Sequence, residues 1–520
     1  MSAAYSVAPP AANFESSREQ YERITAFLSA TEAMHLGHAA LEERLTREGR
    51  ELQRRLLQEH LDLRAAAERT VAEVRGSDGG RRAETRSLGV NLGSVFGGVR
   101  SVRLVYQAAG VRGLAPMDAV LNRPSGYYSH GIRRLVAEHA AKDSFEEVIA
   151  EVEAITGCRV NKRQVEELAM TAAADFDAFY TRAPLELSVI GPRAHVVLSF
   201  DGKGIVVRTE DLREATRKAA SLGSRKLKKR LTRGEKRNRK RMAEVATVYA
   251  VEPFVRDAED VLRELRPARD VVQRRPKPTL KRVWASVVQD MTEVIDEAFH
   301  HARRLDPNLE RHWVVVVDGN KDQIRAVRRA AKRHGVCIVL IVDLMHVLEY
   351  LWKAAYCFHA EGTQPAQDWV TERLRALLLG HDPGQIAAGM RRSATRQNLA
   401  AAARKPVDAC ARYLINNRRW IDYPTALHYG FPISTGVVEG ACRYLVKDRM
   451  DRTGARWSLP GAEAVLRLRA LRTSGDFADY WEFHLEQELR RNHLNFYADA
   501  QPPDPMPPAR PPKARLRRIK

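Results

Sequence analysis

The chain is short of several residue types, and each shortage excludes a class of protein. It has five cysteines among 520 residues, and no two of them form a Cys-x-x-Cys pair, so a zinc ribbon is not supported. A zinc site near Cys357, His359 and His346 remains an alternative to cysteines that only pack. No apolar run approaches the ~18 residues that a transmembrane helix needs. The segment Met1–Asn13 lacks the basic-then-apolar pattern of a secretory signal, so we expect a cytoplasmic protein.

Acidic residues are also scarce relative to basic ones. Lys plus Arg number 86 and Asp plus Glu number 65, which gives a formal net charge of +21. Such an excess predicts a polyanionic partner, which could be DNA, RNA or an anionic membrane surface. Hydrophobic residues make up 44% of the chain, enough for sizeable cores, and a chain of this length is expected to form two to four domains.

Three acidic residues lie at the ends of predicted elements. Asp201 follows the apolar run His195–Phe200, and Asp318 follows Trp313–Val317. Glu439 lies between glycines at the start of a basic helix. Carboxylates at the carboxyl ends of buried strands face an opening where a ligand fits, and Mg²⁺ prefers such oxygen ligands. Both aspartates precede glycine, and Asp-Gly is a common turn pair, but the three acids together in a basic chain favour metal-dependent cleavage of phosphodiesters.

The segment before residue 190 is predicted to be mainly helical. Residues 14–75 have the composition of a long helix, and residues 88–108 that of a β-hairpin turning near Gly97. Further helices are expected at 144–155, opened by a capping box of Ser144 and Glu147, and at 162–181. The second of these helices is reached through a short turn that contains glycine.

These last two helices have the outline of a helix-turn-helix. The second opens with Asn161, Lys162 and Arg163, and in that motif the first residues of the second helix reach base edges in the major groove. Many helical hairpins share this outline, so a purely structural pair is the alternative.

After Pro192 the pattern becomes that of a mixed sheet. The expected strands are 195–200, 205–208, 243–251, 313–317 and 337–342, with helices at 283–304 and 321–334. Three strands, a helix, and then strand–helix–strand is the order of an RNase H-like sheet, in which the first and fourth strands are neighbours. We therefore expect Asp201 and Asp318 to lie together.

A dense basic run occupies residues 217–241 and contains Lys228, Lys229 and Arg230. It has no aromatic residue, and we interpret it as a mobile loop that contacts phosphates without sequence preference, since each neutralised phosphate releases counterions. A merely solvated charge run is the alternative.

The rest of the chain is predicted to be helical. Residues 344–428 are too long for a simple connection and are interpreted as an all-α insertion. The helix 436–449 places Glu439, Arg443 and Lys447 on one face, at i, i+4 and i+8; Glu439 and Arg443 could alternatively form an ordinary helical ion pair. Further along lies a basic cluster with an aromatic residue: Arg449, Arg452, Arg456 and Trp457. Such a cluster is suited to contacting phosphates and stacking on bases; the alternative is that the tryptophan belongs to the core. The Pro-rich basic tail after Asn495 is expected to be disordered.

Several of these segments together resemble a known family. They are Ser199-Phe-Asp-Gly-Lys-Gly204, Val315-Val-Val-Asp-Gly319, Val342-Asp-Leu-Met-His-Val347, Trp420-Ile-Asp-Tyr-Pro424 and Ile433-Ser-Thr-Gly-Val-Val-Glu-Gly-Ala-Cys-Arg443. The chain resembles bacterial insertion-sequence transposases, most of all the ISKra family, over nearly its whole length. The resemblance implies an RNase H-like core whose acidic triad holds Mg²⁺, two ions in all, with Mn²⁺ able to replace it.

Carried over by position, Asp201 and Asp318 are the first two acids of that triad and Glu439 is the third. Asp343 also ends an apolar strand and is an alternative second acid, with His346 as a supporting residue. Asp343 could instead be a helix N-cap and His346 a core histidine.

The implied activity is DNA transposition. The enzyme would bind double-stranded DNA at the element ends, cleave it to free a 3′-OH, and join that end to target DNA. Two ends must be held together, so we expect a homodimer or larger assembly on DNA, associated with the bacterial nucleoid. The alternatives are a relic transposase that binds DNA without catalysis, and an RNase H-like nuclease that cuts without strand transfer.

The expected fold class is α/β: a mixed-sheet RNase H-like core with an all-α insertion and a mainly helical DNA-binding region before it. The expected domains are a helical region at 1–80, a helix-turn-helix-like region with a small hairpin at 81–190, the core at 191–345 and 431–490, the insertion at 346–430, and a basic Pro-rich tail at 491–520.

Overall fold

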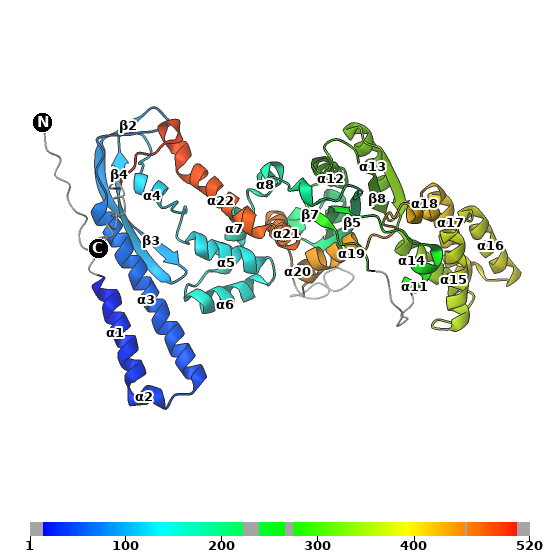
Figure 1. Ribbon diagram of the computed structural model, residues 1–520, viewed down its shortest axis with the longest axis horizontal. Helices are drawn as coiled ribbons and strands as arrows, with labels where there is room; N and C mark the ends of the chain where they lie inside the picture. Colours follow the sequence, from blue (N-terminus) through cyan, green and yellow to red (C-terminus); the bar gives the residue numbers. More distant parts are fainter. Residues whose placement is uncertain (1–13, 222–238, 266–273, 453–454, 507–520) are drawn as a thin grey trace, which may run out of the picture. The chain divides into compact units, whose positions relative to one another are not determined.

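The computed structural model describes residues 14–221, 239–265, 274–452 and 455–506, and its fold is mixed α/β. The chain divides into two compact units (Figure 1). The first unit combines the residues up to Phe179 with those from Phe477 onward, and the second is Tyr180–Asp476. The sequence analysis placed residues up to 490 in the core. In the structure, the segment after Asp476 belongs to the first unit instead.

The first unit begins with two long helices that lie antiparallel. α1 (Glu15–Ser29) and α3 (His38–Ala67) are joined by the short α2 (Thr31–Met34). Ser16 N–H donates to Glu59 Oε1 (2.8 Å), and Gln20 Nε2 donates to Glu48 Oε2 (3.0 Å). The prediction of one helix over 14–75 was therefore wrong, because the chain reverses where extended residues at 30 and 37 interrupt it.

A β-hairpin follows, as predicted. β3 (Glu84–Ser94) pairs with β4 (Gly97–Gln107) in full antiparallel register, and the turn uses Gly97 at φ 120°, a left-handed conformation that glycine adopts without strain. A smaller pair, β1 (Val74–Arg75) and β2 (Arg81–Arg82), lies before it in the chain.

The segment after Asn495 is ordered as far as residue 506, which corrects the prediction of a disordered tail there. Two short 3₁₀ helices, η5 (Leu494–Phe496) and η6 (Ala498–Ala500), flank Tyr497. Tyr497 packs into a buried cluster with Val74 and Tyr106. Apolar burial of this kind offsets the entropy cost of ordering the tail. Residues 507–520, the end of the predicted tail, lie outside the described residues.

The helices of the first unit after the hairpin agree broadly with the prediction. They are α4 (Pro116–Val120), α5 (His130–Ala140), α6 (Phe145–Thr156), α7 (Lys162–Ala172) and α8 (Phe176–Arg182). The capping box of Ser144 and Glu147 is present, and Gly157 at φ 68° ends α6. The predicted helix 162–181 is two helices, since α7 stops before a break ahead of Phe176.

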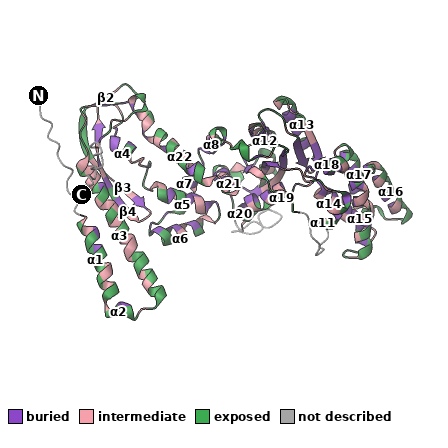
Figure 2. Ribbon diagram, viewed as in Figure 1, coloured by how far each residue is buried: buried purple, intermediate pink, exposed green. Residues whose placement is uncertain are grey.

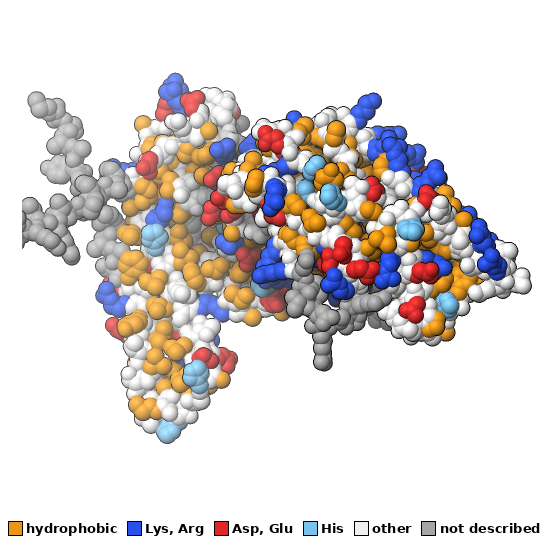
Figure 3. Space-filling view, turned by 45° about the vertical axis from the view of Figure 1, so that its right-hand side comes forward, with side chains coloured by type: hydrophobic (Ala, Val, Ile, Leu, Met, Phe, Trp, Pro, Cys, Tyr) orange, Lys and Arg blue, Asp and Glu red, His pale blue; other side chains and the backbone are white. Residues whose placement is uncertain are grey.

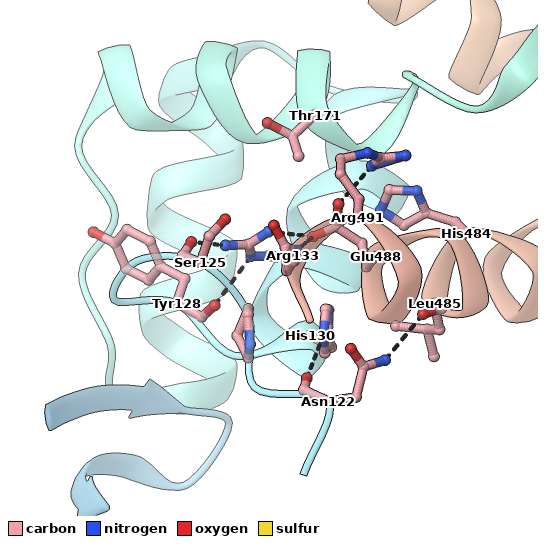
Figure 4. Close-up of polar contacts among 12 residues, drawn as sticks. Asn122, Ser125, Tyr128, His130, Arg133, Thr171, His484, Leu485, Glu488 and Arg491 are labelled. Atoms are coloured by element: carbon pink, nitrogen blue, oxygen red, sulfur yellow. Dashed lines mark hydrogen bonds and ion pairs between the residues drawn. The ribbon is translucent and has the colours of Figure 1, made fainter. Parts of the chain in front are cut away.

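The last helix, α22 (Phe477–Asn492), is fastened to the first unit by buried polar contacts (Figure 4). Arg133 of α5 forms an ion pair with Glu488 at 3.1 Å, and both side chains are more than 90% buried. His484 Nδ1 contacts Asp175 Oδ2 at 2.7 Å. A buried charge is tolerated only with a partner, so these pairs specify where α22 docks.

The second unit is built on a five-stranded sheet in the order β7-β6-β5-β8-β9. The strands are β5 (His195–Val206), β6 (Lys240–Val251), β7 (Thr279–Ser286), β8 (Trp313–Val317) and β9 (Ile338–Val342). β5, β6 and β7 pair antiparallel, whereas β5–β8 and β8–β9 pair parallel. β8 is buried along its whole length, and the strands are prominent among the purple, buried parts of Figure 2.

Two predicted boundaries in this sheet were wrong. The expected strands 195–200 and 205–208 form the single strand β5, so Asp201 lies inside a strand and not at its end. The residues around Val283 belong to β7, not to a helix, and the helix α12 (Met291–Leu305) starts later at an Asp290 capping box. Periodicity alone does not distinguish a short apolar strand from the first turns of a helix.

Helices cover the sheet and extend beyond it. α12 and α13 (Lys321–His334) pack together, and α21 (Leu459–Ser474) packs on β7. The segment 344–428, predicted to be helical, forms α14 (Leu344–Ala355), α15 (Gln364–Leu378), α16 (Pro383–Arg396), α17 (Ala401–Asn417) and α18 (Tyr423–His428). No helix within the described residues is both long enough and apolar enough to cross a membrane.

The buried pair in Figure 4 gives a test of how α22 is held. Arg133→Met removes one of the two cations that pair with the buried Glu488, while Arg491 stays 2.7 Å from its Oε1. Loss of a charged donor from a buried carboxylate costs ~1–3 kcal/mol, so hydrogen–deuterium exchange in α5 and α22 should rise on the order of 10-fold or more. The control is Arg134→Met on the same helix, whose exposed pair with Glu138 is worth only ~0.3–0.5 kcal/mol. Equal exchange in the two variants would contradict the account.

Candidate functional site

The two predicted aspartates lie level on neighbouring strands. β5 and β8 pair in parallel, and the last pair is Ser199 with Val316. Asp201 and Asp318 each lie two residues beyond that pair, so the register extended past the end of β8 brings them to corresponding positions. Adjacent strands are about 4.8 Å apart. The expected adjacency of the first and fourth strands is thus confirmed, although Asp201 comes from mid-strand and Asp318 from just beyond the end of β8.

The turn that carries Asp318 is tightly held. Gly319 has φ 87°, and a Cβ placed on it would meet Asn417 Nδ2 at 2.8 Å, so only glycine fits. Asn320 N–H donates to Asp318 Oδ1 (2.8 Å), and the Tyr413 hydroxyl donates to the Asp318 carbonyl oxygen (2.8 Å). Tyr413 and Asn417 belong to α17. The all-α insertion therefore shapes the site, a role that the sequence analysis missed because nothing in the spacing linked these residues.

Asp343 is fully buried and caps α14. Its Oδ1 accepts from Met345 N–H (3.0 Å) and Thr435 N–H (3.3 Å), and its Oδ2 accepts from His346 Nδ1 (2.8 Å) and from the Thr435 hydroxyl. A carboxylate has about four lone-pair positions, and here all are used. Burial alone would raise the pKa of Asp343, but the hydrogen bonds from His346 and Thr435 lower it. The N-cap interpretation of Asp343 is confirmed.

His346 lies among the acids as a cation. The hydrogen bond to Asp343 raises its pKa to about 9, against the opposing effect of burial; the charges of Asp343, Asp318 and Glu439 add to the increase. Its Nδ1 lies 3.9 Å from Glu439 Oε1. The imidazolium is half-buried and held in place by a buried carboxylate, so it is not a plain core histidine.

Glu439 lies in α19 (Gly436–Ala441), directly before the π-helix η4 (Cys442–Lys447). Thr435 Oγ1 donates to Glu439 Oε1 (3.2 Å). Burial and the nearby Asp343 charge raise the pKa of Glu439. π-Helical turns occur often at functional sites, and this one starts three residues after the predicted third acid.

Cys442 connects Glu439 with Asp201. Burial raises the pKa of the Cys442 thiol, and the charge of Asp201 and a hydrogen bond to it raise the pKa further; Glu439 acts in the same direction. Glu244 on β6 is a second neighbour of Asp201: burial raises its pKa, with a further contribution from the Asp201 charge. Neither residue was singled out from the sequence, because each comes from a different element.

The distances between possible metal-ligand atoms separate the acids into different groups. Within the parts of the chain that the structure describes, three sets of residues have ligand atoms that all lie within 4.8 Å: Asp343, His346 and Glu439; Asp296, His300 and His334; and His139, Asp143 and Glu151. Asp201, Asp318 and Glu439 do not form such a set, and neither do Cys357, His359 and His346. The three predicted acids still suit Mg²⁺ by chemistry, because they offer only carboxylate oxygens. The set around Asp343 suits it poorly, since the aspartate already accepts from four donors and Mg²⁺ prefers oxygen ligands to imidazole.

The basic residues predicted to contact DNA differ in how exposed their side chains are. Arg443 and Lys447 of η4 are exposed. Arg449 and Trp457 are buried, with the guanidinium 4.7 Å from the ring centroid and the indole N–H donating to Met450 O (3.1 Å). Both side chains are therefore buried: Trp457 is part of the core, which is the alternative that the sequence left open for it, and Arg449 packs against it. Arg452 is partly buried and Arg456 exposed.

The predicted helix-turn-helix residues lie in the first unit. Asn161 caps α7, Lys162 pairs with Glu146, and Arg163 pairs with Glu167 (2.9 Å) while remaining 90% exposed. Lys228, Lys229 and Arg230 lie outside the described residues.

A largely apolar cavity of about 350 Å³ lies beside the acids in the second unit. Tyr249, Phe254 and Phe431 line it, and Met345 and Gly436 bring it to within a few residues of His346 and Glu439 along the chain. Four ionisable side chains, Glu252, Arg256, Glu264 and Arg275, also line it.

Comparison with known proteins adds no assignment. No protein-family model matches this chain, and no curated protein matches it.

The titration of His346 tests the geometry of the acids. In metal-free buffer its imidazole should titrate near pH 9, and Asp343→Asn should bring the value back toward 6.5, because the largest cause is lost. Since the folded pKa lies above the unfolded one, the stabilisation is complete below about pH 6.5 and is lost as the pH rises through 9. NMR of the histidine ring protons, assigned with His346→Gln, measures this. A wild-type value near 6.5 would contradict the arrangement.

Proposed function

We propose that this protein is a DDE-type transposase that binds the ends of an insertion sequence and catalyses metal-dependent DNA cleavage and strand transfer. One observation carries the proposal: the parallel pairing of β5 with β8 sets Asp201 level with Asp318, and the Glu439 helix packs against β5. Acids from a central strand, from the turn after its neighbour and from a later helix supply the carboxylate oxygens with which a protein holds the ions of two-metal phosphoryl transfer.

The sheet order supports an RNase H-like core. Three antiparallel strands, β5, β6 and β7, are followed by α12 and by the parallel strands β8 and β9, with β5 in the centre beside β8. Three strands, a helix and then strand–helix–strand is the pattern expected for that fold, although the expected first two strands are the single strand β5 and the third antiparallel strand, β7, was expected to be helical. A fold alone does not fix an activity, so the proposal depends on the acids.

Asp318 is preferred to Asp343 as the second acid. Asp343 is fully buried and its oxygens already accept from four donors, so binding a metal would cost it several hydrogen bonds. Asp318 is partly exposed. We assign Asp343 a positioning role, in which it orients His346 and Thr435 toward Glu439.

In this proposal Asp201, Asp318 and Glu439 hold Mg²⁺, which when bound lowers the pKa of water and stabilises the attacking and leaving oxygens. Other residues of the chain position the substrate. Asp343 fixes His346 through Nδ1, which leaves Nε2 to donate a hydrogen bond to a phosphate oxygen. The negative charge of Asp343 contributes to the raised pKa of Glu439. A cation bound in the site reduces this repulsion.

A basic helix face beside the acids supports a DNA substrate. α13 starts directly after the Asp318 turn, and its exposed cations are Lys321, Arg325, Arg328, Arg329, Lys332 and Arg333. Lys and Arg side chains are also numerous on the face drawn in Figure 3. Such a face is the electrostatic footprint of phosphate binding.

Cleavage of duplex DNA that carries the sequences flanking this gene tests the triad. We expect Asp201→Asn, Asp318→Asn and Glu439→Gln each to abolish Mg²⁺-dependent cleavage while DNA binding persists. Asp343→Asn should lower the rate ~10–100-fold, the size typical of lost supporting contacts. Asp322→Asn, an exposed acid four residues after Asp318, is the matched control and should cleave normally. Loss of cleavage with Asp343→Asn but not with Asp318→Asn would move the second acid.

Joining of DNA ends separates a transposase from a nuclease. A pre-cut end with a free 3′-OH, incubated with supercoiled plasmid and Mg²⁺, should become covalently joined to the plasmid. Cleavage without joining would favour a nuclease, and tight binding of the ends with neither reaction would favour a relic that only binds DNA. Either result would contradict the proposal.

A further inference from the structure

We infer that the second unit contains a transition-metal site, distinct from the acids, formed by Asp296, His300 and His334. One ligand atom from each residue lies within 4.8 Å of the others. Two imidazole nitrogens and one carboxylate oxygen form a ligand set that suits Zn²⁺ and not Mg²⁺, because imidazole is a borderline-soft ligand.

The secondary structure presents these three side chains to one point. Asp296 and His300 are four residues apart on α12, so they share one face of that helix. His334 is the last residue of α13, which packs against α12. The rings of His300 and His334 lie edge to face, with centroids 4.6 Å apart.

The distances leave room for one ion. His334 Nε2 lies 3.0 Å from Asp296 Oδ1, and His300 Nε2 lies 3.9 Å from Asp296 Oδ2. Both histidines thus turn the same nitrogen toward the carboxylate, and the Nε2 of imidazole is a common zinc-ligating atom. Asp296 therefore meets His334 through Oδ1 and His300 through Oδ2.

Arg333 hydrogen-bonds to Oδ1 of Asp296. Its Nη2 donates to Asp296 Oδ1 at 2.6 Å. A ligating carboxylate is usually held by such an outer hydrogen bond, which orients it.

An ion here would join α12 to α13. These helices precede and follow β8 in the chain, so the ion would fasten the α12–β8–α13 segment that carries Asp318. Because His300 is 73% exposed, water can complete a fourth position, as in open zinc sites. The inference does not depend on the proposed function, since it uses none of the triad residues.

Zinc binding to untagged, EDTA-treated full-length protein tests the site. We expect one tightly bound Zn²⁺ at pH 7.5 that is retained in excess Mg²⁺. His300→Asn and His334→Asn should each weaken binding ~100-fold or more, since loss of even an outer contact costs ~10–100-fold. His381→Asn, an exposed histidine of the same unit, is the matched control and should bind as the wild type does.

A second readout keeps the test independent of folding defects. Zn²⁺ at 100 times its dissociation constant should raise the thermal midpoint of the wild type by about 5 °C or more. The variants should unfold in EDTA within a few degrees of the wild type and should show no rise. Equal zinc binding by the wild type, His300→Asn and His334→Asn, or no binding at all, would overturn the inference. Loss of the ion in His346→Asn instead would place it at the other cluster and would also overturn it.

Discussion

The second unit depends on one pairing, that of β5 with β8. It is the parallel contact at the centre of a sheet whose other half is antiparallel. β8 is buried throughout and β5 is buried along its first half, so apolar packing on both faces fixes the register. A slip by one residue would turn every side chain to the other face. The same register sets Asp201 beside Asp318, so the core and the proposed chemistry rest on a single constraint.

Around this pair, hydrogen bonds join elements that are far apart in the chain. Asp343 links the start of α14 to Thr435, Cys442 links η4 to Asp201, and Tyr413 links α17 to the Asp318 turn. Each link involves a buried or half-buried polar group that is costly to leave unpaired. The acids are thus held in a preorganised arrangement, and His346 balances part of their charge.

Much of this could be predicted from sequence, and the exceptions have physical reasons. The hairpin β3–β4, the capped helix α6 and the apolar strands β8 and β9 carry strong local signals. The strand β7 was missed because its apolar residues directly precede a helix, and the continuity of β5 through Asp201 was missed because two glycines follow it. The docking of α22 and Tyr497 on the first unit depends on long-range pairs such as Arg133 with Glu488, which no local pattern encodes. At the site, Asp201, Asp318, Asp343 and Glu439 were identified as candidates, whereas Thr435, Tyr413 and Cys442 act only through tertiary contacts.

The central claim is that a divalent cation binds between Asp201, Asp318 and Glu439. It can be measured directly by loading Fe²⁺ in place of Mg²⁺, with Zn²⁺ present to fill any nitrogen-rich site, and adding ascorbate and peroxide. Hydroxyl radicals released at the ion cut the nearest backbone, and mass spectrometry locates the cuts. The account predicts cuts around residues 201, 318 and 439 that excess Mg²⁺ suppresses. Cuts confined to one of these segments, or absent from all three, would contradict it.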